Sequence, residues 1–217
     1  IIVASSDKAY GNYPLNSLPY KENYPLKPNF PYDTSKACAD MIAKSYSSKL
    51  FNLPILITRF ANIYGPGQLN FSALIPDCIR AALGFGKFVP RTNGNHYRDF
   101  LFIDDVIKLY LKMSESISES KLLRGEVFNA GSNKPINIKS LIFKIFKIIN
   151  NQDFLNDFKD TVSFPNSNCK GEILIQQMDY KKVEKYFKWE PQVELEQGIQ
   201  ISAEWYMSYM QKYYKNN

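Results

Sequence analysis

Histidine, paired cysteine and long apolar runs are scarce in this sequence. His96 is the only histidine among 217 residues, and the three cysteines are widely spaced without a CxxC pair: Cys38, Cys78 and Cys169. These counts argue against a disulfide framework and against a metal site, so no metal is expected. No stretch of 18 apolar residues occurs, and the start lacks the segments of a signal peptide. We expect a soluble, cytoplasmic protein with reduced cysteines.

The charged residues are distributed along the chain and do not cluster. Twenty-seven basic and 21 acidic side chains give a net charge of +6, and many lysines stand singly on expected helix surfaces. No dense basic run with interleaved aromatic residues appears. We therefore expect neither a nucleic-acid nor a membrane partner, although a mild positive field would suit an anionic substrate.

Short apolar runs alternate with helix-like segments. Strands are expected at 1–4, 54–58, 99–103 and 127–129, and helices at 32–51, 74–83, 104–118, 138–149, 179–187 and 195–214, with a polar loop over 150–168. The alternation predicts an α/β fold with a doubly wound parallel sheet and a smaller α+β lobe. The expected boundaries are 1–70 for the sheet domain and 71–217 for the lobe, with 99–130 returning to the sheet. The chain starts on a strand-like run without an initiator methionine, so we expect it to be truncated at its start.

Three motifs place polar side chains where strands or helices begin or end. The first is Ser5-Ser6-Asp7-Lys8-Ala9-Tyr10-Gly11, directly after the first strand, and the carboxyl ends of strands face the ligand crevice in open α/β sheets. A solvated turn would explain each of these residues singly. Only their combination indicates an active site.

The second motif is a tyrosine four residues before a lysine, in the stretch Tyr32-Asp33-Thr34-Ser35-Lys36. Two helical residues four apart share one face, and an ammonium group beside a phenol favours the phenolate. The pair can therefore serve as acid and base. Alone the spacing is weak, because the chain contains 15 tyrosines.

The third motif follows the second expected strand and reads Arg59-Phe60-Ala61-Asn62-Ile63-Tyr64-Gly65-Pro66-Gly67, with Asn70 and Phe71 after it. Its glycines and proline predict a tight loop at a strand end. An arginine and an asparagine there could reach a sugar or a phosphate, although a plain turn is the alternative.

The order of these motifs resembles the extended short-chain dehydrogenases/reductases, and among them the sugar-nucleotide epimerases and dehydratases. SSDKAYG, PYDTSK, RFANIYGPG, RDFLFIDDV and FNAGS cover residues 1 to about 132. The family likeness implies a Rossmann fold, NAD as cofactor and a nucleotide-sugar substrate. The first and second motifs look most like those of CDP-glucose 4,6-dehydratases, in which lysine occupies the place of Lys8, and the likeness therefore implies CDP-glucose as the substrate.

The resemblance also implies roles for individual residues. Tyr32 would deprotonate the C4 hydroxyl of the hexose, Lys36 would hold the nicotinamide ribose, and Ser6 would bind the same C4 oxygen. Asp7 would be the acid for the hydroxyl leaving C6, and Lys8 would assist proton removal at C5. Cofactor contacts are further implied for Tyr32, Ser5 and Phe60, and substrate contacts for Asn62, Asn70, Phe71, Arg91, Arg98 and Asn129.

One part of the family pattern is missing, because none of the ten glycines forms G-x-x-G-x-x-G or G-x-G-x-x-G. A dinucleotide pyrophosphate normally rests on that loop. Three alternatives therefore remain: another 4,6-dehydratase, a 4-epimerase, or an inactive sugar-nucleotide-binding fragment. The likeness further implies a homodimer through a four-helix interface, with the helix from Tyr32 and the helix after Asn70 as candidates.

Overall fold

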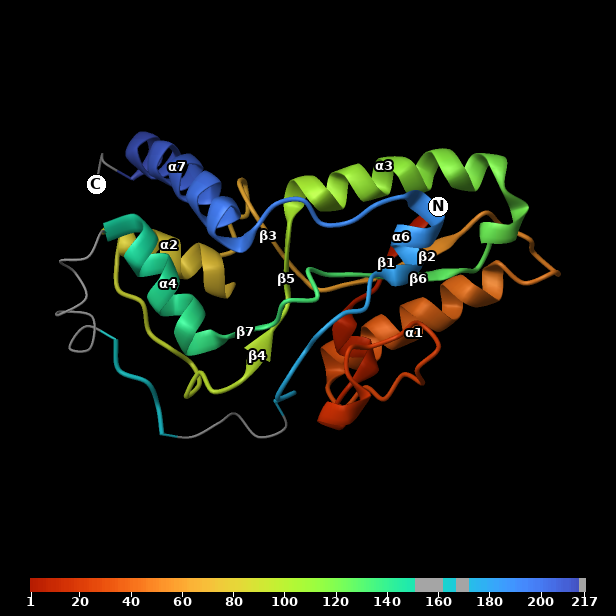
Figure 1. Ribbon diagram of the computed structural model, residues 1–217, viewed down its shortest axis with the longest axis horizontal. Coiled ribbons are helices and arrows are strands. Elements are labelled where there is room, and N and C mark those ends of the chain that lie inside the picture. Colours follow the sequence, from red (N-terminus) through yellow and green to blue (C-terminus); the bar gives the residue numbers. More distant parts are fainter. Residues whose placement is uncertain (151–161, 167–171, 215–217) are drawn as a thin grey trace. The chain divides into compact units, whose positions relative to one another are not determined.

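The computed structural model describes residues 1–150, 162–166 and 172–214. Most of the loop expected over 150–168, and Cys169, lie outside these residues. The chain divides into two units. Figure 1 shows the chain with colours that follow the sequence. The first unit consists of Ile1–Ile63, Arg98–Pro135 and Ile173–Gln192, and the second of Tyr64–Tyr97, Ile136–Glu172 and Val193–Asn217. The return to the sheet unit thus spans Arg98–Pro135, where 99–130 was expected, and a further segment of the expected lobe joins it.

A three-stranded parallel sheet forms the centre of the first unit. The strands β1 (Ile2–Ala4), β2 (Leu56–Phe60) and β6 (Val127–Ala130) lie in the order β1-β2-β6. Val3 is opposite Ile57, and Ile57 is opposite Val127. All residues of β2 and β6 are buried, as expected for a parallel sheet covered on both faces. The predicted α/β class is therefore confirmed.

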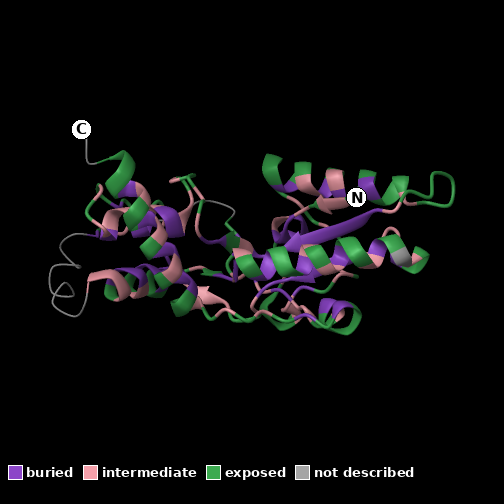
Figure 2. Cartoon of the chain, turned by 90° about the horizontal axis from the view of Figure 1, so that it is seen from above, coloured by how far each residue is buried: buried purple, intermediate pink, exposed green. Residues whose placement is uncertain are grey.

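Helices cover the two faces of this sheet, as Figure 1 shows. On one face Ala43 of α1 (Pro31–Tyr46) packs against Ile55, Ile57 and Val127. On the other face, α3 (Ile103–Glu119) and α6 (Lys181–Phe187) pack with Leu56, Phe60 and Phe128. The side chains of β2 alternate between the two clusters because successive residues of a strand point to opposite faces. In Figure 2 the strands β2 and β6 are buried, and the helices have exposed residues.

Among the described residues, the second unit is built on α2 (Leu74–Ala82), α4 (Ile138–Asn150) and α7 (Leu195–Tyr213), which pack on one another. The remaining strands are short and form two pairs, β3 (Asn62–Tyr64) with β5 (Phe100–Phe102), and β4 (Tyr97–Arg98) with β7 (Ile136–Asn137). The described part of the chain also contains the 3-10 helices η1 (Asp7–Tyr10), η2 (Leu15–Ser17) and η3 (Lys121–Leu123). Among the described helices, none is both long enough and apolar enough to cross a membrane.

Candidate active site

The turn after β1 is a short 3-10 helix. The Ser5 amide donates to the Thr58 carbonyl at 2.8 Å, which extends the pairing of β1 with β2 by one residue. Ser6 is the N-cap of η1, in extended conformation, and its Oγ accepts a hydrogen bond from the Lys8 amide at 3.2 Å. Capping by a serine hydroxyl satisfies an amide that the first turn leaves without a partner. The cap places Asp7 directly beyond the carboxyl end of the strand.

Asp7 is a buried carboxyl group, and only one of its two oxygens has a hydrogen-bond partner. It is 2% exposed, and the Ser6 hydroxyl donates to its Oδ1 at 3.0 Å, while its Oδ2 has no hydrogen-bond partner. Burial raises the pKa of Asp7 to about 6, against the opposing effects of Ser6, Lys8 and Arg98. A carboxyl group that titrates near neutrality can donate a proton to a reacting group.

Tyr32 and Lys36 lie at the start of α1, which has proline at its first position. The Lys36 Nζ donates to the Ala4 carbonyl at 3.1 Å, and the Ser5 hydroxyl donates to the Lys36 carbonyl at 3.2 Å, so the helix is held at the end of β1. The Tyr32 ring is 54% exposed, and its centroid lies 5.9 Å from Lys36 Nζ and 6.0 Å from Lys8 Nζ. Two ammonium groups therefore flank the phenol. The structure brings together the residues of the first two motifs.

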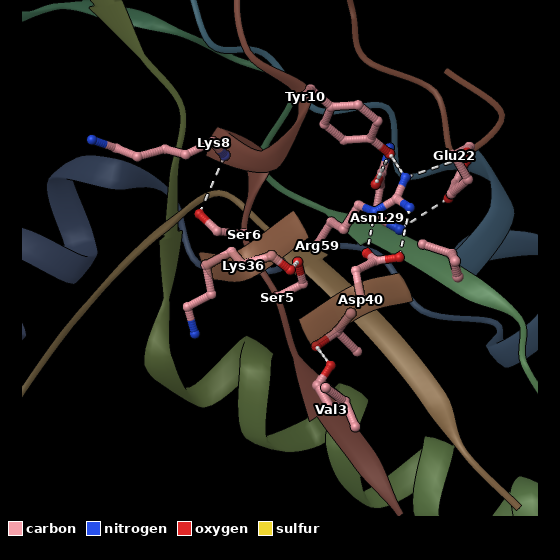
Figure 3. Close-up of polar contacts among 12 residues, drawn as sticks. Val3, Ser5, Ser6, Lys8, Tyr10, Glu22, Lys36, Asp40, Arg59 and Asn129 are labelled. Atoms are coloured by element: carbon pink, nitrogen blue, oxygen red, sulfur yellow. Dashed lines mark hydrogen bonds and ion pairs between the residues drawn. The ribbon is translucent and has the colours of Figure 1, made fainter. Parts of the chain in front are cut away.

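Arg59, which the third motif suggested as a contact for a sugar or a phosphate, is held in the interior by other groups of the protein. It is 5% exposed, and its Nε and Nη2 donate to the two carboxylate oxygens of Asp40 at 2.7 and 3.0 Å. Its Nη1 donates to the Tyr10 hydroxyl at 2.9 Å and to the Glu22 carbonyl at 3.2 Å, as Figure 3 shows for this group of residues. These contacts hold the guanidinium group in the interior of the protein.

Two further expected contacts have no support in the structure. Asn129 is 0% exposed, its Oδ1 accepts from the Tyr10 hydroxyl at 2.7 Å, and its Nδ2 donates to the Tyr20 carbonyl at 3.0 Å, so a nucleotide has no access to it. Phe60 is buried in the cluster beneath α3 and stacks on Tyr110, with 5.3 Å between the ring centroids. Phe60 belongs to the core, and we withdraw its assignment to the cofactor.

Arg98 is held beside the Asp7 turn. Its side chain is buried, its Nη1 donates to the Ile173 carbonyl at 2.7 Å, and its charge opposes the rise in the pKa of Asp7. Asn62 is half-buried, and its Nδ2 donates to the Asp99 carbonyl at 3.0 Å. The two side chains are thus fixed by backbone carbonyl groups next to the candidate site.

Asp99 is a residue whose importance the sequence did not indicate. Its buried carboxylate accepts hydrogen bonds from the amides of Ser132, Asn133 and Met178, at 2.8, 3.1 and 3.1 Å, and from the Ser132 hydroxyl at 2.6 Å. Burial raises the pKa of Asp99, and these donors oppose the rise. The only sequence signal was its position directly after Arg98. Asp99 shapes the chain that follows β6.

Asn70, Phe71 and Arg91 belong to the second unit. Asn70 is exposed, and its Oδ1 accepts from the Ser72 amide at 3.0 Å. The half-buried Phe71 ring lies 6.1 Å from the ring of Tyr206, and Arg91 is exposed. Their contact with a substrate stays a prediction.

The residues of this chain fit one end of NAD. An exposed tyrosine and a neighbouring lysine at the carboxyl end of β1 suit the nicotinamide ribose, because phenol and ammonium groups both bind hydroxyls. The pyrophosphate end is different. Gly131 is the only glycine that directly follows a strand of the three-stranded sheet, and a Cβ atom there would lie 2.4 Å from Asp99 Oδ2. Asp99 thus fills the space that a phosphate cradle would need.

Comparison with known proteins agrees with this geometry. The GDP-mannose 4,6 dehydratase family model matches residues 1–202. The human dTDP-D-glucose 4,6-dehydratase is 28% identical over 205 residues, which cover 94% of this chain and 55% of the relative. The chain thus spans about half the length of this curated relative.

Two solved structures share the fold. The dTDP-glucose 4,6-dehydratase of Bacillus anthracis in complex with NAD is 29% identical with a TM-score of 0.82, covering 99% of this chain and 63% of that one. The UDP-glucuronic acid 4-epimerase of Bacillus cereus in complex with UDP-glucuronic acid and NAD is 25% identical with a TM-score of 0.81, covering 96% and 61%. The predicted resemblance and the Rossmann fold are confirmed, and the chain belongs to the GDP-mannose 4,6 dehydratase family.

Proposed function

We propose that this chain carries the catalytic residues of an NAD-dependent sugar-nucleotide 4,6-dehydratase. The observation that carries the proposal is the Ser6–Asp7 couple, in which Asp7 is buried and has a pKa of about 6. The next residue, Lys8, brings its ammonium to 6.0 Å from the centroid of the Tyr32 ring. A 4,6-dehydratase needs both a tyrosine to accept a hydroxyl proton and an acid to protonate a leaving hydroxyl. Family membership and the names of the relatives support the same reaction.

In this proposal the first step belongs to Tyr32. As the phenolate, Tyr32 accepts the proton of the C4 hydroxyl, and the Lys36 ammonium lies 5.9 Å from the centroid of its ring. The Ser6 hydroxyl, which donates to Asp7 in this structure, binds the C4 oxygen by turning its proton from Asp7 to that oxygen. The resulting C4 ketone acidifies the hydrogen on C5.

Elimination falls to Asp7 and Lys8. Asp7 gives its proton to the C6 hydroxyl, which leaves as water, while the neutral amine form of Lys8 takes the C5 proton and a C5=C6 double bond forms. The Lys8 Nζ lies 6.0 Å from the centroid of the Tyr32 ring, and it returns the proton to C5 at the end of the reaction. A 4-epimerase has no need of an acid at C6, so the Asp7-Lys8 pair favours the dehydratase over the epimerase among the relatives.

NAD, when bound, supplies the acceptor of the C4 hydride and its donor to C6. Tyr32, Lys36 and Ser5 are the residues of this chain that would hold its nicotinamide ribose. Since Asp99 occupies the space beside Gly131, we expect the chain by itself to bind NAD weakly. Isothermal calorimetry of this chain with NAD tests this, and micromolar binding would contradict it. Weak binding by the intact gene product as well would favour the inactive sugar-nucleotide-binding alternative.

For the substrate we propose CDP-glucose, on the strength of Lys8 after Asp7; dTDP-glucose, named in the relatives, is the alternative. The test is to incubate the intact gene product with NAD and each nucleotide sugar separately. The expected product is a 4-keto-6-deoxy sugar nucleotide, lighter than its substrate by one water, detected by mass spectrometry and NMR. A product of unchanged mass with inverted C4 would establish the epimerase instead.

We also propose a homodimer through α1. This helix leaves Met41, Ile42 and Tyr46 exposed, and such apolar side chains on one helix suit a helical interface. The other candidate, α2, has no exposed residue, because it packs against α4 and α7. Sedimentation of wild type and Ile42→Glu tests the proposal. A monomeric wild type would refute it.

A further inference from the structure

The helix that carries Tyr32 and Lys36 also carries a buried carboxylate one turn later. Asp40 follows Lys36 by four residues, as Lys36 follows Tyr32, so the three residues lie along one stripe of α1. Asp40 is buried and receives two hydrogen bonds from Arg59 of β2, at 2.7 and 3.0 Å. A two-pronged bond between a guanidinium and a carboxylate fixes orientation as well as distance. This pair therefore fixes α1 against β2.

Tyr10 continues the connection to the Asp7 turn. Arg59 Nη1 donates to the Tyr10 hydroxyl at 2.9 Å, and this hydroxyl donates to Asn129 Oδ1 at 2.7 Å (Figure 3). Burial raises the pKa of Tyr10 to about 12, so the hydroxyl keeps its proton and both bonds keep their direction. Tyr10 is the last residue of η1 and Asp7 is the first. The network thus joins the two elements that carry the candidate catalytic residues.

We propose that Asp40, Arg59, Tyr10 and Asn129 form a clamp that sets the position of α1 relative to η1, and thereby of Tyr32 relative to Asp7. They are positioning residues, since all four side chains are buried. The consequence for turnover rests on the proposed function, whereas the mechanical link between the two elements does not.

Stability alone is a poor explanation for such a network. Buried ion pairs often contribute no more than well-packed apolar side chains of the same volume, because both charges lose their hydration. What apolar side chains do not supply is the direction of the bonds, from Arg59 to Asp40 and from Arg59 through Tyr10 to Asn129. Directed bonds are what two reacting groups on separate elements require.

The test uses Tyr10→Phe, which removes the hydroxyl that links η1 to the clamp and leaves the Arg59–Asp40 pair in place. The matched control is Tyr110→Phe on α3. Its hydroxyl is also within hydrogen-bond distance of β2, 3.2 Å from Thr58 Oγ1, but it lies on the opposite face of the sheet. Both variants of the intact gene product are measured by amide hydrogen exchange and by steady-state kinetics.

For Tyr10→Phe we expect exchange at least about fivefold faster in both 5–11 and 31–46, and no such change for the control. We also expect kcat to fall about tenfold with KM within about twofold, because misplacement of reacting groups affects the chemical step. The proposal is overturned if exchange is unchanged, or if kcat falls no more than in Tyr110→Phe. If the wild type turns over no nucleotide sugar, the proposed function fails and the exchange measurement alone decides the clamp.

Discussion

Successive turns of α1 carry polar side chains with opposite surroundings. Tyr32 is 54% exposed and faces two ammonium groups, whereas Asp40, two turns on, is 2% exposed and is bound by Arg59. The first turn lies at the carboxyl end of β1, open to a ligand, and Asp40 lies where the helix covers the sheet. One helix face can therefore serve both reaction and alignment. The distance of a residue from the carboxyl end of β1 decides which of these two roles its side chain has.

The exposed side of this comparison is tested most directly by Tyr32→Phe. The change removes the proton acceptor, so we expect kcat to fall about 10³- to 10⁴-fold in the intact gene product. Because the side chain is largely exposed, the free energy of unfolding should change by less than about 0.5 kcal/mol. The control is Tyr213→Phe on α7, a tyrosine of similar exposure, which should retain full turnover. A variant with near wild-type kcat would remove Tyr32 from the reaction.

The buried side is tested by Arg59→Met, measured by urea unfolding. This change leaves Asp40 buried and unpaired, and we expect the free energy of unfolding to fall by about 3–5 kcal/mol. The double variant Arg59→Met with Asp40→Leu removes both charges and should recover most of that loss. If the single variant were as stable as the wild type, the prediction that Asp40 is left buried and unpaired would be wrong. If the double variant kept both its stability and its kcat, alignment by the pair would be refuted.

Asp7 shares one property with each of Tyr32 and Asp40, since it is placed to react and is also buried. Its pKa is raised to about 6 by burial, so between about pH 4 and pH 6 the folded protein holds a proton that the unfolded chain releases. Wild-type stability should therefore decline as the pH rises through this range. Asp7→Asn avoids this cost and should be more stable than the wild type above pH 6, by up to about 3 kcal/mol.

Thermal unfolding from pH 3 to pH 8 measures this difference. The two proteins should converge below about pH 4, and Asp7→Asn should also lose dehydration. Asp104→Asn, at an exposed position in the first turn of α3, is the control and should follow the wild-type curve in shape. A difference between wild type and Asp7→Asn that does not vary with pH would mean that burial does not control the acid.

Periodicity in the sequence predicted the order of the main strands and helices, and it failed where an element is short or contains a buried charge. The second strand was expected at 54–58 but is Leu56–Phe60, because Arg59 in a fully buried strand resembles a loop residue until Asp40 is seen beside it. Strands of two or three residues, such as β4 and β7, are too short to show alternation. The helix expected to reach residue 51 ends at Tyr46.

The residues of the candidate site also differ in how well the sequence predicted their surroundings. Ser6, Asp7, Tyr32 and Lys36 were assigned through the family resemblance, and for Tyr32 and Lys36 the four-residue spacing also has a geometric meaning. Asn129 was assigned through the same resemblance and Arg59 from its place near a strand end, but their hydrogen-bond partners are distant in the sequence: Tyr10 lies 119 residues from Asn129 and 49 from Arg59. Spacing within the sequence cannot show such partners. The four-residue step from Lys36 to Asp40 was the one local signal available.

The carboxylate of Asp99 restricts which substitutions the segment after β6 can accept. It collects the amides of Ser132 and Asn133, and it leaves no room for even a methyl group at Gly131. Saturation mutagenesis aimed at a new sugar or base preference would therefore lose most of its library at position 131 to misfolding. Directed evolution of this protein would do better to keep Gly131 and Asp99 constant as a pair.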